Sequence, residues 1–140
     1  MPTADRRRVL VRRWLAKART DLTLASVVLE RDPDMDPWVC CFHAQQAAEK
    51  TIKAVLVAGG VEPPFIHNLV ALHALMPPDL ELNVTVPDLA DLTASARGTR
   101  YATETDTDGT EDPTWDEAER AVVVAGRILA AVRAYPGEPG

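Results

Sequence analysis

Apolar residues recur every three or four positions along most of the chain, the spacing that places side chains on one face of a helix. A first helix is predicted over residues 4–31, with the stripe Trp14, Ala18, Leu22, Ala25 and Leu29. A last helix, beginning near residue 115, repeats the spacing with Ala118, Val122, Ala125, Leu129 and Val132. Residues 82–86 come closest to the alternation of a strand, but prolines isolate them. The pattern predicts helices only.

Residues with specific backbone preferences mark where the intervening helices begin and end. Asp36 before Pro37 is typical of a helix start, and Gly59 begins a helix stop, which predicts a second helix between them. A short third helix is predicted over 68–76, just before two prolines, and a fourth over 87–100.

The start of the last helix carries its own signal. Thr114 followed three residues later by Glu117 forms a capping box. The predicted fold is therefore all-α, an up-and-down helical bundle of four long helices plus one short helix. We expect a single domain over 1–140, with a core over about 13–134, a basic N-terminal turn at 1–12 and an acidic loop at 103–113.

Composition agrees with closely packed helices, because 46% of residues are hydrophobic but only 5% are aromatic. The net charge of −6 argues against broad binding of nucleic acid. Charge is uneven, however, since 7 of the 15 basic residues precede position 20 and acidic residues gather over 104–119. Two solvated surfaces are the simpler interpretation. The alternative is a basic arm for phosphate or for an acidic partner.

The sequence also indicates in which cellular compartment the protein is expected. Apolar runs are short and interrupted by Arg or Lys, and no apolar segment follows the basic N-terminus, so neither a membrane span nor a secretory signal is expected. Cys40 and Cys41 are adjacent, and on a helix they diverge too far to bridge each other. We expect a cytoplasmic protein.

Two polar groups are candidate binding residues. About 100° per residue places His43, Gln46, Lys50 and Lys53 on one face of the second helix. This row could hold a nucleotide's phosphates or hydrogen-bond a partner chain. Alternatively, it is a solvated face on which Glu49 and Lys53 form an i,i+4 pair.

The second group is Arg97, Arg100 and Tyr101, at the end of the fourth helix. Two guanidinium groups beside a phenol can grip a phosphate. The alternative is that the arginines stabilise the last helical turn through the helix dipole.

Other chemistries find no support. His67 and His73 lack the spacing of metal ligands, and His67 more simply positions the start of the third helix. The acidic residues 104–117 do not follow the order of a calcium-binding loop. No catalytic residue, metal or cofactor is predicted.

Several of these residues carry a family resemblance. The segment 42–50, Phe-His-Ala-Gln-Gln-Ala-Ala-Glu-Lys, followed by Lys53, resembles the second helix of HEPN domains. The first helix is matched by 14–18 with Asp21, Leu22 and Ala25, and the turn into the third helix by 62–64 with 67–69. Arg100-Tyr101 resembles an element after the fourth helix, so the similarity covers about residues 13–134.

The resemblance implies a homodimer with its sites near the interface, and exposed apolar residues of the first helix such as Val9, Leu10 and Trp14 would favour a partner. It also implies binding of a nucleotide, or of a minimal nucleotidyltransferase in a toxin–antitoxin-like pair. HEPN ribonucleases carry Arg followed by His after four to six residues, and no His of this chain follows an Arg in that way. A non-catalytic binding module is therefore predicted. The alternatives are a metal-independent endoribonuclease toxin with a degenerate site, and a purely structural dimer.

Overall fold

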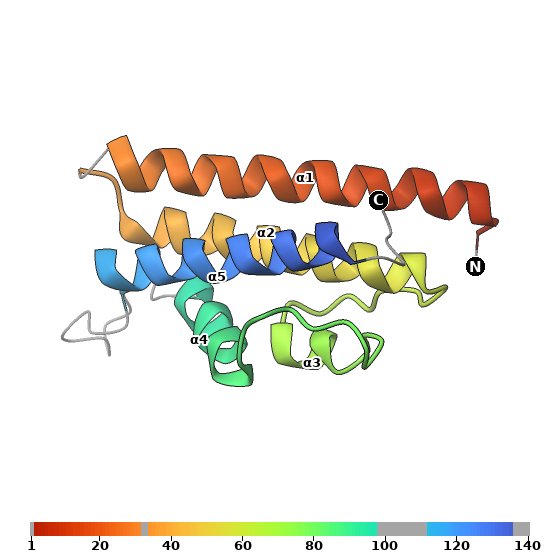
Figure 1. Ribbon diagram of the computed structural model, residues 1–140. Coiled ribbons are helices and arrows are strands. Elements are labelled where there is room, and N and C mark those ends of the chain that lie inside the picture. Colours follow the sequence, from red (N-terminus) through yellow and green to blue (C-terminus); the bar gives the residue numbers. More distant parts are fainter. Residues whose placement is uncertain (1, 32–33, 98–111, 136–140) are drawn as a thin grey trace.

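The computed structural model describes residues 2–31, 34–97 and 112–135. Within these ranges the chain forms five helices and no strand. The helices are α1 (Ala4–Arg31), α2 (Pro37–Ala58), α3 (Leu69–His73), α4 (Val86–Arg97) and α5 (Trp115–Ala134). The prediction of an all-α helical bundle is confirmed (Figure 1).

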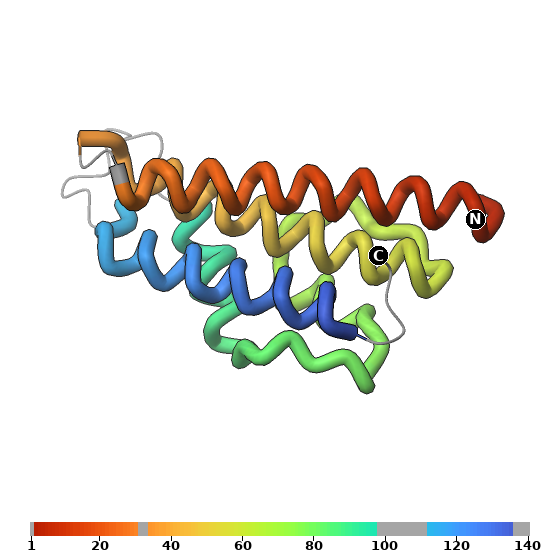
Figure 2. The backbone as a smooth tube through the Cα atoms, turned by 45° about the horizontal axis from the view of Figure 1, so that its top comes forward, coloured from red at the N-terminus to blue at the C-terminus, as the bar shows by residue number. Residues whose placement is uncertain are grey.

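Three of the helices lie side by side along one direction. α1 and α2 run antiparallel, and α5 lies alongside with the same direction as α2 (Figures 1 and 2). α4 crosses this layer at a steep angle, and the short α3 lies beside α4. α2 packs against each of the other four helices, so it is the centre of the fold.

Small side chains allow α2 to occupy this central position. Ala44, Ala47 and Ala48 are completely buried, which lets neighbouring backbones approach closely. Larger residues, Ile52 and Leu56, then fill the space toward the end of the helix and are also buried. The tight packing explains why a chain so poor in aromatic residues still has a continuous core.

The predicted helix starts are confirmed. The Asp36 side chain accepts a hydrogen bond of 2.9 Å from the Trp38 amide at the start of α2, and the helix ends before Gly59. At the start of α5, the Thr114 hydroxyl accepts a hydrogen bond of 3.1 Å from the Glu117 amide. Each cap satisfies an amide that has no partner within its helix.

One predicted boundary was wrong. α3 ends at His73 rather than near Met76, because the amides of Leu75 and Met76 bond three residues back instead of four, and prolines follow. The strand-like residues 82–86 form no strand, as predicted. Asn83 takes a positive φ of 59°, which turns the chain, and Thr85 exchanges hydrogen bonds with Asp88 at the start of α4.

Candidate functional site

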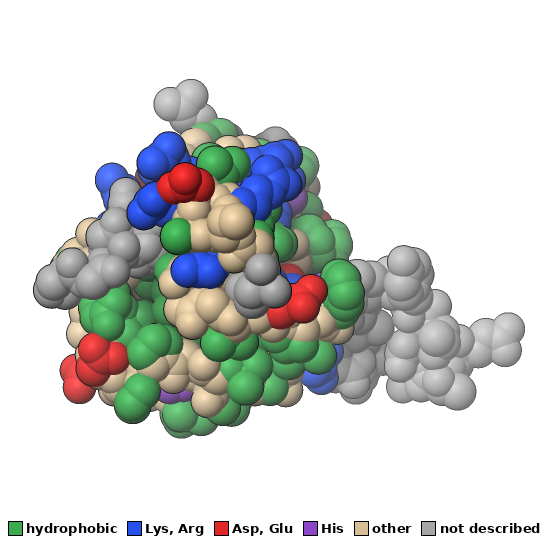
Figure 3. All heavy atoms as spheres, turned by 90° about the vertical axis from the view of Figure 1, so that its right-hand side faces the viewer, with side chains coloured by type: hydrophobic (Ala, Val, Ile, Leu, Met, Phe, Trp, Pro, Cys, Tyr) green, Lys and Arg blue, Asp and Glu red, His purple; other side chains and the backbone are tan. Residues whose placement is uncertain are grey.

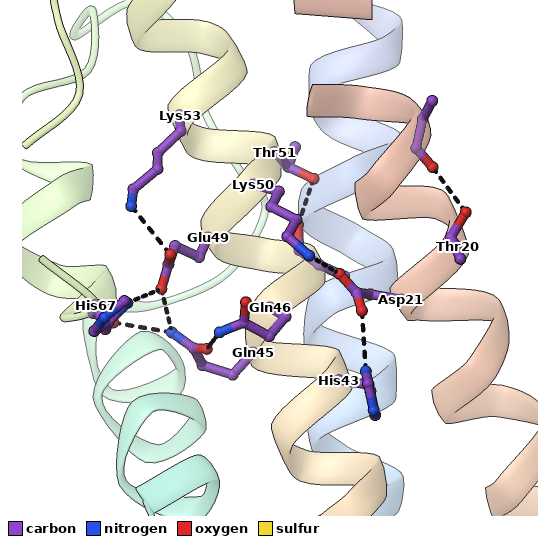
Figure 4. A network of polar contacts seen from close by, with 12 residues as sticks. Thr20, Asp21, His43, Gln45, Gln46, Glu49, Lys50, Thr51, Lys53 and His67 are labelled. Atoms are coloured by element: carbon purple, nitrogen blue, oxygen red, sulfur yellow. Dashed lines mark hydrogen bonds and ion pairs between the residues drawn. The ribbon is translucent and has the colours of Figure 1, made fainter. Parts of the chain in front are cut away.

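The polar row of α2, formed by His43, Gln46, Lys50 and Lys53, lies on one face of the helix as predicted. Its side chains, however, belong to two separate clusters. Each cluster is centred on a buried carboxylate, Asp21 from α1 or Glu49 from α2 itself (Figure 4). His43 and Lys50 contact the first carboxylate, and Lys53 contacts the second. The row is therefore not a simple array of free cations and donors.

Asp21 joins α1 to α2. It is 9% exposed, and its Oδ1 atom lies 2.9 Å from Nδ1 of His43. Because a carboxylate only accepts, the Nδ1 atom carries the proton and donates. Lys50 donates to the other oxygen, Oδ2. Both oxygens of the buried carboxylate are thus bonded, which offsets the cost of removing it from water.

Glu49 joins α2 to the segment that precedes α3. Its Oε2 atom accepts from Nζ of Lys53 at 3.1 Å, and its Oε1 atom lies 2.9 Å from Nδ1 of His67. Nε2 of Gln45 also donates to Oε1, at 3.1 Å. Burial alone would raise the pKa of Glu49, but the hydrogen bonds from His67, Gln45 and Lys53 outweigh it, and the pKa lies below its ordinary value.

The two glutamines extend the second cluster. Nε2 of Gln45 also donates to the backbone oxygen of His67 at 2.9 Å, and Nε2 of Gln46 donates to Oε1 of Gln45 at 2.9 Å. The segment before α3 is thereby fixed to α2 through both the backbone and the side chain of His67. The predicted role of His67 at the start of the third helix agrees with this contact.

The burial of the second cluster corrects one interpretation of the row. The Glu49–Lys53 pair was expected on a solvated face, and the pair is present. Its side chains, however, are only 6% and 8% exposed, respectively. The helix is covered there by the chain leading to α3, a contact between distant residues that spacing on one helix does not reveal.

The second predicted group does not join the first. Arg97 is exposed at the end of α4, and the residue before it, Ala96, accepts a hydrogen bond of 2.6 Å from Nε1 of Trp38. Trp38 lies in the first turn of α2, fifteen residues before Lys53, which corresponds to roughly 22 Å along the helix. Arg97 and Lys53 therefore lie at different ends of the molecule. The other two predicted residues, Arg100 and Tyr101, lie outside the described residues.

A surface hollow of about 470 Å³ continues the polar row toward the end of α2. Its floor includes Lys53 and Val57, and one wall is formed by Leu10 and Trp14 of α1. The opposite wall is the segment 62–65, which includes Phe65, a side chain that is fully exposed at 101%. Basic and apolar side chains gather at this end of the molecule (Figure 3).

The cysteines and other features add no further chemistry. Cys40 and Cys41 are free and buried, so the prediction that they do not bridge each other is confirmed. Burial raises the pKa of the Cys41 thiol to about 11, which keeps it protonated and unreactive. Among the described residues no group of three potential ligands could hold a metal ion, and none of the described helices is long and apolar enough to cross a membrane.

Sequence reasoning missed Asp21 as a member of the site. A signal was present, because Asp21 continues the buried stripe of α1 at helical spacing between Ala18 and Ala25, where an apolar residue would be expected. A charged residue in such a stripe needs a partner on the helix that covers it. The identity of that partner depends on how α1 packs on α2.

The fold and the two clusters define a small helical protein whose central helix is joined to α1 and to the segment before α3 by the contacts of two buried carboxylates. The family model of the HEPN domain matches residues 11–135, and the chain belongs to the HEPN family. It is similar to TT1696 from Thermus thermophilus, a crystal structure with 29% sequence identity and a TM-score of 0.68. That similarity covers 88% of this chain and 95% of TT1696. A comparison with curated proteins finds no match.

Proposed function

We propose that this protein is a HEPN-type binding module that forms a homodimer, binds a nucleotide-handling partner protein and is not itself catalytic. The observation that carries the proposal is an exposed stripe on α1. Val9, Leu24 and Val27 are 42%, 41% and 45% exposed, although they belong to the element that packs most extensively on α2. Exposed apolar side chains arranged in a line mark a surface for another protein.

The stripe has the spacing of a helix–helix contact. Positions 9, 13, 16, 20, 24 and 27 follow one another at intervals of three or four and share one face of α1. Ala16 and Thr20, at the middle of the stripe, are small and exposed. A second helix could therefore approach closely at the centre, while the larger side chains near each end pack around it.

The neighbouring polar row favours protein binding over phosphate binding. Lys50 and Lys53 are each paired with a carboxylate, Asp21 and Glu49 respectively. A phosphate would have to compete with these carboxylates for the ammonium groups, and any displaced carboxylate would be left buried without its cation. We therefore place partner binding first, and nucleotide binding by His43, Gln46, Lys50 and Lys53 second.

Membership of the HEPN family is the reason for the class of partner protein proposed next. We propose a separately encoded minimal nucleotidyltransferase, in a pair that resembles a toxin–antitoxin module. Membership of the HEPN family supports a role in nucleotide or RNA biology. The missing Arg–His element of HEPN ribonucleases supports the non-catalytic role. Co-purification of the native protein with its neighbours, followed by mass spectrometry, tests this partner.

Light scattering tests the homodimer. Leu24→Glu and Val27→Glu are expected to convert a dimer into a monomer, because each places a charge within the proposed contact. Val123→Glu is the matched control, since Val123 is 45% exposed but lies on α5. A wild-type protein that is monomeric at every concentration, or a dimer that survives both α1 substitutions, would contradict the proposed interface.

Calorimetry with ATP, GTP and their monophosphates tests nucleotide binding. If the polar row binds phosphate, Lys50→Met should abolish the heat of binding while the helix content by circular dichroism is retained.

Incubation with a mixed RNA pool in the absence of metal tests the ribonuclease alternative. RNA cleavage that disappears in Arg97→Ala would show that the protein is an enzyme rather than a non-catalytic binding module.

A further inference from the structure

We propose that the hollow between α1 and the segment 62–65 binds an acidic segment of a partner protein, with an apolar side chain in the hollow and its carboxylates on the basic residues of α1. This inference rests on the proposed function, because it names the chemistry that the partner must present. It concerns the face of α1 that lines the hollow, beside the stripe that contains Leu24 and Val27.

The walls of the hollow are suited to an apolar side chain. Leu10 and Trp14 form one side, and Pro63, Pro64 and Phe65 form the other. A volume of about 470 Å³ is within the range of sites that enclose a ligand group. Phe65 is completely exposed in the isolated chain, so covering it with an apolar group would remove a large apolar surface from water.

The floor of the hollow offers little net charge. Lys53 lies there, but its ammonium group is held by Oε2 of Glu49 at 3.1 Å. Both side chains are buried, so the cation is balanced before any ligand arrives. An anion at the bottom of the hollow would therefore gain little, whereas an apolar group would meet the side chains of Val57 and Trp14.

The rim on the α1 side is different, because its cations have no ion-pair partner among the residues that the structure describes. Arg6 lies four residues from Leu10 and Lys17 lies three residues from Trp14, so both stand beside the residues of α1 that line the hollow. Both are exposed, and neither has an ion pair within the described part of the chain. Figure 3 shows Lys and Arg side chains gathered at this end, beside apolar ones.

The combination fits an acidic peptide segment better than a nucleic acid. Nucleic acid would need a continuous track of cations along its phosphates, but the opposite wall carries Glu62 and apolar residues. A peptide with one large apolar residue flanked by Asp or Glu matches both the apolar walls of the hollow and the basic residues of α1. Repulsion by Glu62 then directs the carboxylates of the partner toward α1.

Selection of a random-peptide display library on the immobilised full-length protein tests the proposal. The expected outcome is enrichment of sequences in which Asp or Glu flank Phe, Trp or Leu. Synthetic peptides of the enriched sequence should bind in a fluorescence anisotropy titration. Raising the salt from about 0.1 M to about 1 M, which shortens the screening length from about 10 Å to about 3 Å, should weaken this binding.

Two pairs of matched variants locate the site. Lys17→Glu and Phe65→Ser should lower the affinity for the enriched peptide about tenfold or more. Arg12→Glu, on another face of the same helix, and Leu75→Ser, at an exposed position away from the hollow, should change it by less than about twofold. All four positions are exposed at the surface, so the variants are expected to fold.

The remaining outcomes separate the two proposals. Enriched peptides that are neutral or basic, or acidic peptides that bind equally well to Lys17→Glu and Phe65→Ser, would overturn the acidic site while leaving the homodimer of α1 in place. No enrichment at all, or preferential binding of a labelled single-stranded RNA that Lys17→Glu abolishes, would also overturn it. A dimer that Leu24→Glu leaves intact contradicts the proposed homodimer interface alone.

Discussion

The described residues contain two buried carboxylates, and the side chains paired with them differ in how far they are exposed to water. Asp21 is paired across two helices with His43 and Lys50, whose side chains are 25% and 22% exposed. Glu49 is paired within its own helix with Lys53, whose side chain is only 8% exposed. Water reaches the partners of the first carboxylate but hardly reaches the second pair. We therefore expect the Glu49 cluster to determine stability and the Asp21 cluster to tolerate change.

Removal of the two carboxylates should give the largest difference. Glu49→Ala leaves the buried Lys53 ammonium without its carboxylate, and we expect it to lower the free energy of unfolding by about 3–5 kcal/mol. Asp21→Ala leaves partners that can turn toward water, and a loss of about 1–2 kcal/mol is expected. Urea denaturation followed by circular dichroism measures both. Equal losses would show that the clusters are equivalent.

Removal of the two lysines should give a smaller difference in the same direction. Lys53→Met keeps the aliphatic stem but deprives Glu49 of its cation, while His67 and Gln45 remain bonded, so we expect a loss of about 2–3 kcal/mol. Lys50→Met should cost about 1 kcal/mol or less, because the Lys50 side chain is 22% exposed and His43 remains bonded to Asp21. Thermal unfolding of both variants provides the measurement, and a larger effect at Lys50 would reverse the comparison.

Acid should weaken the Glu49 cluster. Because the pKa of Glu49 is lowered in the folded protein below its ordinary value of 4.5, the unfolded chain takes up the proton first as the pH falls. The stability that this group contributes is therefore fully present above about pH 4.5 and is lost as the pH falls through the folded pKa.

Urea midpoints recorded from neutral to acidic pH test this dependence. The difference in stability between the wild type and Glu49→Gln should shrink as the pH falls. Asp88, whose pKa is lowered by its hydrogen bonds with Thr85, adds an acid dependence that both proteins share and that cancels in the difference. A difference that is constant with pH would show that Glu49 has no special protonation behaviour in the fold.

The smallest effect is expected at His67, the exposed member of the Glu49 cluster. Its side chain is 77% exposed, so His67→Ala should lower the free energy of unfolding by only about 0.5–1 kcal/mol. His67→Asn can keep a donor near the carboxylate and should restore part of that loss. If His67→Ala is as damaging as Lys53→Met, burial does not explain the ranking of the contacts.

Much of the fold could be predicted because its signals are local. Asp36 and Thr114 each cap a helix through a hydrogen bond within three residues, and Gly59 follows the end of α2 directly. The end of α3 was misplaced because tight turns and an α-helix share the same apolar spacing over so few residues. Local chemistry determines where helices begin more reliably than where short ones end.

The candidate site could be predicted only in part, because its contacts are distant in sequence. Helical spacing placed His43 and Lys50 on one face correctly, yet the carboxylate between them comes from α1, 22 residues before His43. Glu49 meets His67 18 residues later, where the chain turns back along α2. These pairings follow from how the segments pack, which a single sequence does not specify.

The buried position of Cys40 and Cys41 in the middle of this framework has a practical consequence. A thiol-specific reagent cannot modify a side chain that is both enclosed and protonated, so labelling must wait until α2 separates from its neighbours. The rate of modification then reports how often the native protein opens, without any engineered probe. Comparing this rate between Asp21 and Glu49 variants would show which carboxylate holds the central helix closed during such fluctuations.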